Sequence, residues 1–451
     1  MKNPATDSEF RANMRIIILV VAFLGWFFCG MQIAITNLGM RDAAIDLMHL
    51  AGMLDLTHFL ELKKLSPEQL TANLNSNAQL SQWNGLAAKW YARYQVAFLF
   101  GAASGGFLFG LLGDRIGRSR ALAASIIFFS FFTGVSYFVQ TPMQLLVFRF
   151  VACIGIGGTW PNGVSLVSEV WSKASRPWVA SSIGMAGNLG IFVMAKLGGS
   201  IGVTHDNWRW IMLVGAAPII LGVITWFFVK ESPQWITSKT SGQSEQKSSN
   251  QSAFAVFKPP HLGMTLIGIV LATVPLMGGW GAMNWMVPWA SQDGPEELKA
   301  QVLQYRAITS IIGSFFAGWI AMVIGRRTSY FLTSLGILLV AQYTFHFSSP
   351  NESSFLWCAL LFGFFNGVYF GWLPFVLPEL FPTSVRSRGS GVSYNFGRIF
   401  TAVTLFITGE TMMSLFGGEY ASVGQITSLV FLIGMIIILF APDTTKYEMN
   451  D

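Results

Sequence analysis

Long apolar segments separated by short polar ones make up almost the whole chain. Uncharged runs of at least about 18 residues cover 16–40, 94–113, 121–148, 210–229, 262–292, 307–325, 328–345, 353–378 and 420–442. Three further apolar stretches each contain one basic residue: Arg149 begins 149–168, Lys196 lies in 177–204, and Arg398 lies in 389–409. Because a helix needs about 20 apolar residues to cross a bilayer, these stretches predict transmembrane helices.

Turn residues place the helix boundaries. Gln140-Thr141-Pro142 divides the stretch 121–168, which is too long for one helix. The pattern predicts twelve helices, at roughly 16–40, 94–113, 119–139, 143–168, 177–203, 209–229, 262–290, 304–324, 328–346, 354–378, 387–412 and 421–442. Lipid offers the backbone no hydrogen-bond partners, so the predicted fold class is an all-α membrane protein.

Composition supports this class. Charged residues are 11% of the chain and apolar ones 53%, whereas a soluble domain usually carries about 25% charge. The net charge of +6 does not indicate nucleic-acid binding, because no basic stripe with interleaved aromatic residues is present. The three cysteines lie inside apolar runs and predict no disulfide framework.

Basic residues indicate the orientation. With the N-terminus inside, the inner segments hold about twice as many Lys and Arg residues as the outer ones. We therefore expect a multi-pass protein of the cell membrane with both termini cytoplasmic. The first apolar run is too long for a signal peptide and is taken as the first helix.

The polar stretches divide the chain into two bundles. Residues 1–229 form an N-terminal six-helix bundle with a long outer loop at 41–93, and residues 262–451 form a C-terminal six-helix bundle. Between them, 230–261 is a cytoplasmic linker in which 241–252 is polar and of low complexity.

The two halves repeat at a nearly constant offset. Gly117-Arg118 follows the second helix and Gly325-Arg326 follows the eighth. Glu169 and Glu379 end the fourth and tenth helices, and an arginine follows each at the same spacing, Arg176 and Arg386. Such duplication, with a solute site between the repeats, is typical of transporters that rock between two states.

One loop carries a family signature. The segment Gly110-Leu-Leu-Gly-Asp114-Arg115-Ile-Gly117-Arg118 resembles the loop between the second and third helices of the major facilitator superfamily. The resemblance covers the whole chain. It implies two pseudo-symmetric six-helix bundles and transport of a small solute by alternating access.

Further motifs resemble two groups within that superfamily. Arg149 through Gly158 and the segment 230–235 resemble the sugar-porter and organic-ion branches, while 378–386 and 394–398 resemble the metabolite:proton symporters for sialate, lactate and aromatic acids. Two positions depart from the pattern: Met322 replaces the acid of the second-half signature, and Cys29 stands where that group often has Asp. The second departure weakens the case for proton coupling through the first helix.

Three basic residues within the spans are candidate solute ligands, because a charge at the bilayer centre is costly and usually functional. Arg398 lies near mid-membrane with Asn395 three residues earlier on the same face, and guanidinium binds carboxylate with two parallel bonds. The alternative for Arg398 is a structural ion pair. Lys196, two turns from Asn188, and Arg149 are weaker candidates, since Lys196 can extend to the surface and Arg149 can be structural.

Uncharged polar and aromatic residues in the spans are further candidates to line the solute path, although aromatic residues in membrane helices more often pack or mark interfaces. They are Gln32, Asn284, Asn366, Tyr369, Trp26, Trp280, Trp285 and Trp372. All five histidines lie in loops or at helix ends, so neither a histidine proton relay nor a metal site is expected. No cofactor motif is present.

A second set of charged residues predicts a gate at the cytoplasmic side. Its members share placement at inner helix ends: Asp114, Arg118, Glu169, Arg176, Glu379 and Arg386. We expect charge contacts across the halves to hold that side shut.

Together these features predict a monomeric carrier of small organic anions in the lipid bilayer. The alternatives are a neutral-sugar transporter and a receptor of the same fold that does not transport. No nucleophile–base pair, metal cluster or phosphate loop indicates an enzyme.

Proton coupling is a separate hypothesis. Burial beside another cation disfavours the charged form of a lysine, so a buried Lys196 is the candidate to take up a proton with each anion. A uniporter or an exchanger is the alternative.

Overall fold

The computed structural model describes residues 4–66, 69, 72–170, 176–232, 235–236, 256–382 and 385–443. Every regular element within these ranges is helical. The first half contains α1 (Pro4–Leu50), α2 (Leu56–Lys63), α4 (Leu74–Ile116), α5 (Arg118–Val135), α6 (Pro142–Val170), α7 (Arg176–Ile201), α8 (Trp210–Ala216) and α9 (Ile219–Phe228).

The second half begins with a helix that changes its winding. α12 (Leu262–Met277) passes through a π-helical turn, η3 (Gly278–Ala282), and a 3-10 turn, η4 (Met283–Trp285), into α13 (Met286–Asp293). The helices that follow are α14 (Leu298–Val323), α15 (Arg326–Phe347), α16 (Ser353–Glu379), α17 (Arg386–Glu410), α18 (Met412–Phe416), α19 (Tyr420–Thr427) and α20 (Val430–Ile437).

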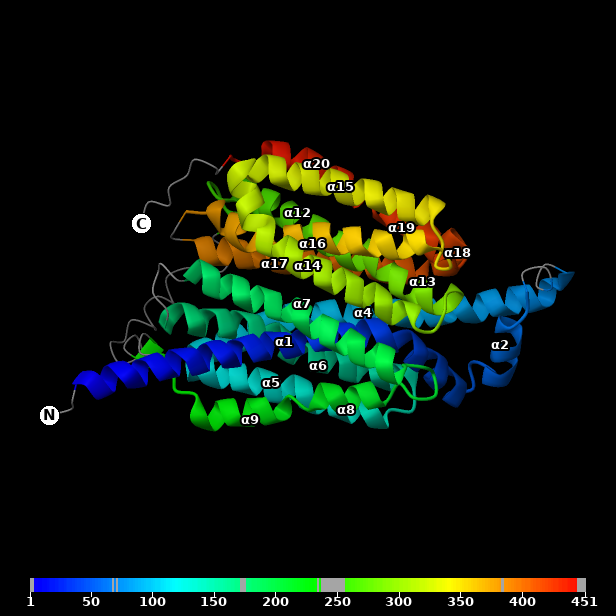
Figure 1. Cartoon of the computed structure of the whole chain (residues 1–451), viewed down its shortest axis with the longest axis horizontal. Helices are drawn as coiled ribbons and strands as arrows, with labels where there is room; N and C mark the ends of the chain where they lie inside the picture. Colours follow the sequence, from blue (N-terminus) through cyan, green and yellow to red (C-terminus); the bar gives the residue numbers. More distant parts are fainter. Residues whose placement is uncertain are drawn as a thin grey trace.

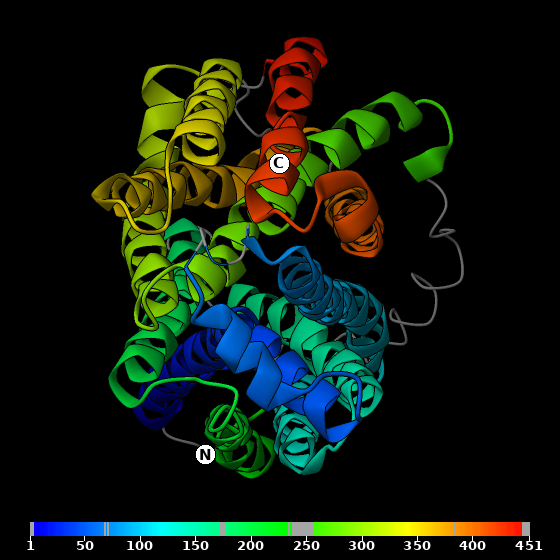
Figure 2. The same ribbon diagram turned by 90° about the vertical axis from the view of Figure 1, so that its right-hand side faces the viewer.

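The two halves form two bundles that lie side by side (Figures 1 and 2). Both chain ends lie at one end of the molecule, which we call the termini end (Figure 1). The other end, where α2 lies, is called the far end, and it faces the viewer in Figure 2. The predicted orientation makes the termini end cytoplasmic.

Each of the twelve predicted spans coincides with a helix or with consecutive helical segments. Ten of the described helices are long and apolar enough to cross a membrane. The two predicted spans outside that set are α7 and α17, which contain Lys196 and Arg398. That these two also cross the membrane stays a prediction.

The segment predicted as an outer loop with helix-like pieces, 41–93, is helical at both of its ends. α1 continues to Leu50 and α4 begins at Leu74, so only 51–73 connects them. The prediction ended the helix at the first charges after the apolar run. Those charges have partners inside the protein: Lys299 binds Asp42, and both Trp208 and Arg209 bind Asp46. Such bonds allow a helix to continue past its apolar segment.

The predicted repeat has a structural counterpart. Gly117 and Gly325 precede α5 and α15 with φ values of 107° and 90°, a conformation that side chains disfavour. The next residue in each half approaches the glutamate predicted to match: Arg118 Nε lies 3.6 Å from Glu169 Oε1, and Arg326 Nη2 lies 3.4 Å from Glu379 Oε1. The same turn and the same pair therefore occur in both bundles.

Candidate solute site between the halves

Arg398 lies where the two bundles meet. It is the middle residue of α17, and its side chain is half-buried. Its Nη1 lies 3.5 Å from Asn395 Oδ1, and its guanidinium stacks 4.8 Å from the ring of Tyr394. Within the described part of the chain, no carboxylate pairs with Arg398. The Arg398 guanidinium, which is always charged, thus has most of its N–H donors available to bind another acceptor.

The other half of the chain faces this cation. A Cβ on Gly106 of α4 would lie 3.7 Å from both Asn395 Oδ1 and Gly157 O of α6. Arg398 also lies near Cys29 of α1. Asn395 and Arg398 therefore face α1, α4 and α6 across the interface between the halves.

Two tryptophans lie near the same level of the first half. The rings of Trp26 and Trp160 are 4.6 Å apart, and a Cβ on Gly187 of α7 would lie 2.8 Å from Trp26 Nε1. Asn188 follows Gly187 and lies two turns before Ala195, whose carbonyl accepts a bond from Gln304 of α14. By helical spacing, Asn188 is on the face of α7 that meets the second half.

Aromatic pairs join the halves between this region and the far end. Phe98 of α4 stacks on Trp280 of η3 at 4.9 Å. Farther out, Trp285 packs between Tyr91 of α4 and Tyr420 of α19, at 5.8 and 5.7 Å. These rings close the space between the bundles on the far side of Arg398.

Charged contacts close the far end as well. Lys299 of α14 donates to Asp42 of α1, and Glu410 of α17 pairs with both Lys89 and Arg93 of α4. Each of these contacts joins one half to the other. The structure is therefore closed at the far end.

Arg149 and Gln32 form a network within the first half rather than between the halves. Arg149 is fully buried and donates to Gln32 Oε1 at 3.0 Å and to Thr36 Oγ1 at 2.6 Å. Gln32 also accepts from Thr133 at 3.2 Å and donates to Gly215 O at 2.9 Å. These bonds support the structural alternative for Arg149.

Tyr369 and Asn284 are also held by neighbours in their own half. The Tyr369 hydroxyl lies 2.6 Å from Ser334 Oγ, and its ring packs 5.0 Å from that of Tyr330. Asn284 Oδ1 accepts from Arg306 Nη2 at 3.1 Å beside the π-helical turn. Trp372 is buried and donates to Arg326 O.

Lys196 is exposed, and it lies about 12 Å along α7 from Asn188 by the helical rise. The proton hypothesis required Lys196 to be buried next to another cation. The exposed position of Lys196 does not meet that requirement. Its role as a solute ligand stays a prediction.

The predicted gate residues make their described contacts within one half. Arg118 Nη2 binds Asp114 Oδ1 at 2.6 Å and approaches Glu169, whose carboxylate accepts from the Ser232 hydroxyl. Trp235 Nε1 donates to Asp114 O at 3.2 Å. Arg176 and Arg386 begin α7 and α17, but their side chains, like the low-complexity segment 241–252, lie outside the described residues.

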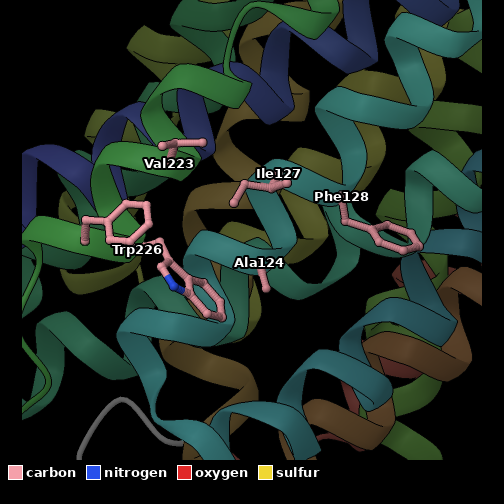
Figure 3. Close-up of a pocket in the computed structure, with 6 residues that line it drawn as sticks. Ala124, Ile127, Phe128, Val223 and Trp226 are labelled. Carbon is pink, nitrogen blue, oxygen red and sulfur yellow. The ribbon is translucent and has the colours of Figure 1, made fainter.

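A separate pocket of about 400 Å³ lies between α5 and α9 (Figure 3). Its lining is apolar: Ala124, Ile127, Phe128, Val223, Trp226 and Phe227. Phe227 is 75% exposed, which places the pocket on the outside of the first bundle. Trp226 is the one lining residue with a polar side-chain atom, so we do not assign the transport site to this pocket.

Three further cations near the far end were not predicted as inward-facing: Arg41 and Lys299 are buried, and Arg306 is half-buried. Each lies where an apolar run ends, and the charge counts placed each in an outer segment. The sequence did contain a signal for Arg41. The helical spacing of apolar residues continues past Arg41 to Leu47 and Met48, which indicates that the helix also continues.

Comparisons with known proteins agree with this architecture. The family model described as Major Facilitator Superfamily matches residues 65–303, more than half of the chain. The chain is 28% identical to the cis,cis-muconate transport protein of Acinetobacter baylyi, over 76% of this chain and 83% of that one. It is 25% identical to the sialic acid transporter NanX of Escherichia coli, over 67% and 73%.

A solved structure shows the same fold. The xylose transporter XylE of Escherichia coli, in an inward-open conformation, aligns with a TM-score of 0.69 over 96% of this chain and 97% of that one, at 16% identity. The family model, the relatives and the fold agree. The chain belongs to the major facilitator superfamily and is a multi-pass membrane transporter, not an enzyme.

Proposed function

We propose that the chain carries small organic anions, namely carboxylates, by alternating access. The observation that carries this proposal is Arg398, a half-buried guanidinium at the middle of α17, between the halves and without a carboxylate partner among the described residues. A carboxylate would complete its hydrogen bonds and neutralise its charge in a medium of low dielectric constant.

The neighbouring side chains suit an anion with a flat apolar part. Asn395 offers an amide donor beside Arg398, and Trp26 and Trp160 offer ring faces in the first half. Relatives are described as transporters of cis,cis-muconate, sialic acid and benzoate, and each of these solutes has a carboxylate. We therefore use benzoate as the probe, with benzamide as its uncharged counterpart.

The test is binding and uptake of benzoate by Arg398 variants. Losing a charged hydrogen bond costs about 1.5–3 kcal/mol, or roughly 10- to 100-fold in affinity. We expect Arg398→Gln to lose at least that much, and Arg398→Lys to lose part of it because an ammonium lacks the planar fork. Thr404→Ala is the control, since Thr404 lies on α17 and the described bonds of its hydroxyl go to Phe400 O and Met277 Sδ.

Two outcomes contradict the proposal. Binding of benzamide as tight as that of benzoate would show that charge is not recognised. Binding of a hexose, with no binding of benzoate, lactate or sialate, would establish the neutral-sugar alternative.

A further inference from the structure

Arg41 is a buried guanidinium whose described hydrogen bonds go to neutral acceptors, as do those of Arg149, but its acceptors come from both halves of the chain. It lies on α1 at the far end and is 2% exposed. Its Nη2 donates to Asn84 Oδ1 at 2.8 Å and to Gln292 Oε1 at 3.2 Å, and its Nε donates to Tyr420 Oη at 3.4 Å. Among the described residues, no carboxylate is hydrogen-bonded to it. Its described side-chain hydrogen bonds therefore go to amide and hydroxyl oxygens.

These acceptors come from both halves of the transporter. Asn84 belongs to α4 in the same half as Arg41, whereas Gln292 belongs to α13 and Tyr420 to α19 in the other half. Opening of the far end separates the halves, so it removes Gln292 and Tyr420 from Arg41 and leaves Asn84. The guanidinium then has free donors that point into the opened mouth.

The surrounding charges favour an anion at that mouth. Lys63 of α2 interacts electrostatically with Arg41, Lys299, Asp42 and Asp293, so the cluster holds three cations and two carboxylates. Opening also separates Lys299 from Asp42, so that Arg41, Lys63 and Asp42 lie on the first wall and Lys299 and Asp293 lie on the second. Asp42 follows Arg41 directly in α1, and adjacent helix residues do not face each other, so Asp42 cannot take over the freed donors easily.

We propose that Arg41 is a second anion site, which takes the carboxylate of the incoming solute when the far end opens and returns to Gln292 and Tyr420 when it closes. This proposal rests on the proposed function. It goes beyond that function because it assigns Arg41 as a second ligand of the solute. Arg41 lies at the mouth, closer to the far end than Arg398 does. A positive mouth also speeds the encounter with an anion.

The test uses a cysteine beside the site, because labelling reports on the mouth directly. Ser291→Cys keeps all three acceptors of Arg41, and the three native cysteines are buried. The labelling rate of a sulfonate-bearing methanethiosulfonate is divided by that of its uncharged hydroxyethyl counterpart. This ratio cancels changes in how often the far end opens, since both reagents need the same opening.

We expect the ratio in Ser291→Cys to fall by roughly tenfold when Arg41→Gln is added, and to be largely kept with Arg41→Lys. Benzoate should slow labelling when Arg41 is present and have little effect in Arg41→Gln. Gln304→Leu is the matched control. It removes another contact between the halves, the bond from Gln304 Nε2 to Ala195 O, without changing any charge, so it should change both labelling rates together and leave their ratio unchanged.

An unchanged ratio in Arg41→Gln, or benzoate protection that does not depend on Arg41, would overturn the second site. If Arg398-dependent binding of benzoate persists in that case, the proposed function stands. If benzoate binds neither at Arg398 nor at the mouth, both proposals fail.

Discussion

The Asp42 carboxylate of α1 accepts a hydrogen bond from the ammonium of Lys299 on α14, and this pair joins the two halves of the transporter. Both side chains are nearly buried, at 11% and 5% exposure. Lys299 also donates to Val203 O of the first half. The pair must break whenever the far end opens, so its strength affects the balance between the closed and open states.

Asp42→Asn should therefore favour opening of the far end. Removing one partner of a buried ion pair costs about 3–5 kcal/mol because the other charge stays buried. Water reaches the open mouth, so opening relieves much of this cost and should become at least about tenfold more frequent. The measurement is the labelling rate of Ser291→Cys by an uncharged thiol reagent.

Asp55→Asn is the control for Asp42→Asn. Asp55 caps α2 at the same end with its side chain, and asparagine can do the same. Equal labelling in the two variants would show that the Asp42–Lys299 pair does not hold the far end closed.

The charge contacts at the termini end predict a smaller effect. Asp114→Asn removes the 2.6 Å contact with Arg118, but Asp114 is 62% exposed, and such pairs are worth about 1 kcal/mol or less. We expect cysteine accessibility from the termini side to rise no more than several-fold. Unchanged accessibility together with unchanged transport would remove Asp114 from the gate.

Gln32→Leu distinguishes a structural network from a solute site. It leaves buried Arg149 without its 3.0 Å acceptor, which should lower the free energy of unfolding by about 1–3 kcal/mol. The Kd for benzoate should stay within about twofold, because Gln32 bonds only inside the first half. The exposed Gln82 supplies the control, Gln82→Leu. A large loss of affinity at unchanged thermal stability would return Gln32 to the solute path.

The sequence predicted the position of nearly every helix, because each helix that crosses lipid needs about 20 mostly apolar residues. It failed at the end of α1, where Arg41 and Asp42 are satisfied by residues far along the chain. It singled out Arg398 as a candidate, since a lone charge within an apolar run is conspicuous. It ranked Arg398 above Arg149 by depth in the span, but it did not show that Arg149 bonds to Gln32 and Thr36, because helices that are apolar on all sides do not reveal which face meets which neighbour.

Close helix packing in the first bundle gives the last prediction. A Cβ on Gly105 of α4 would lie 1.8 Å from Ile154 O of α6, and one on Gly157 of α6 would lie 2.0 Å from Ala102 O of α4. Membrane helices pack through such small residues because their backbones can then touch. Gly105→Ala should force α4 and α6 apart, at a cost of about 1–3 kcal/mol or more, and lower the melting temperature in detergent.

Gly110→Ala tests the same exchange on the same helix where nothing lies within 4 Å, and it should leave the melting temperature unchanged. Because α4 also faces Asn395 at Gly106, a displaced α4 should weaken benzoate binding in Gly105→Ala but not in Gly110→Ala. Equal melting temperatures for the two variants would contradict the close approach of α4 and α6.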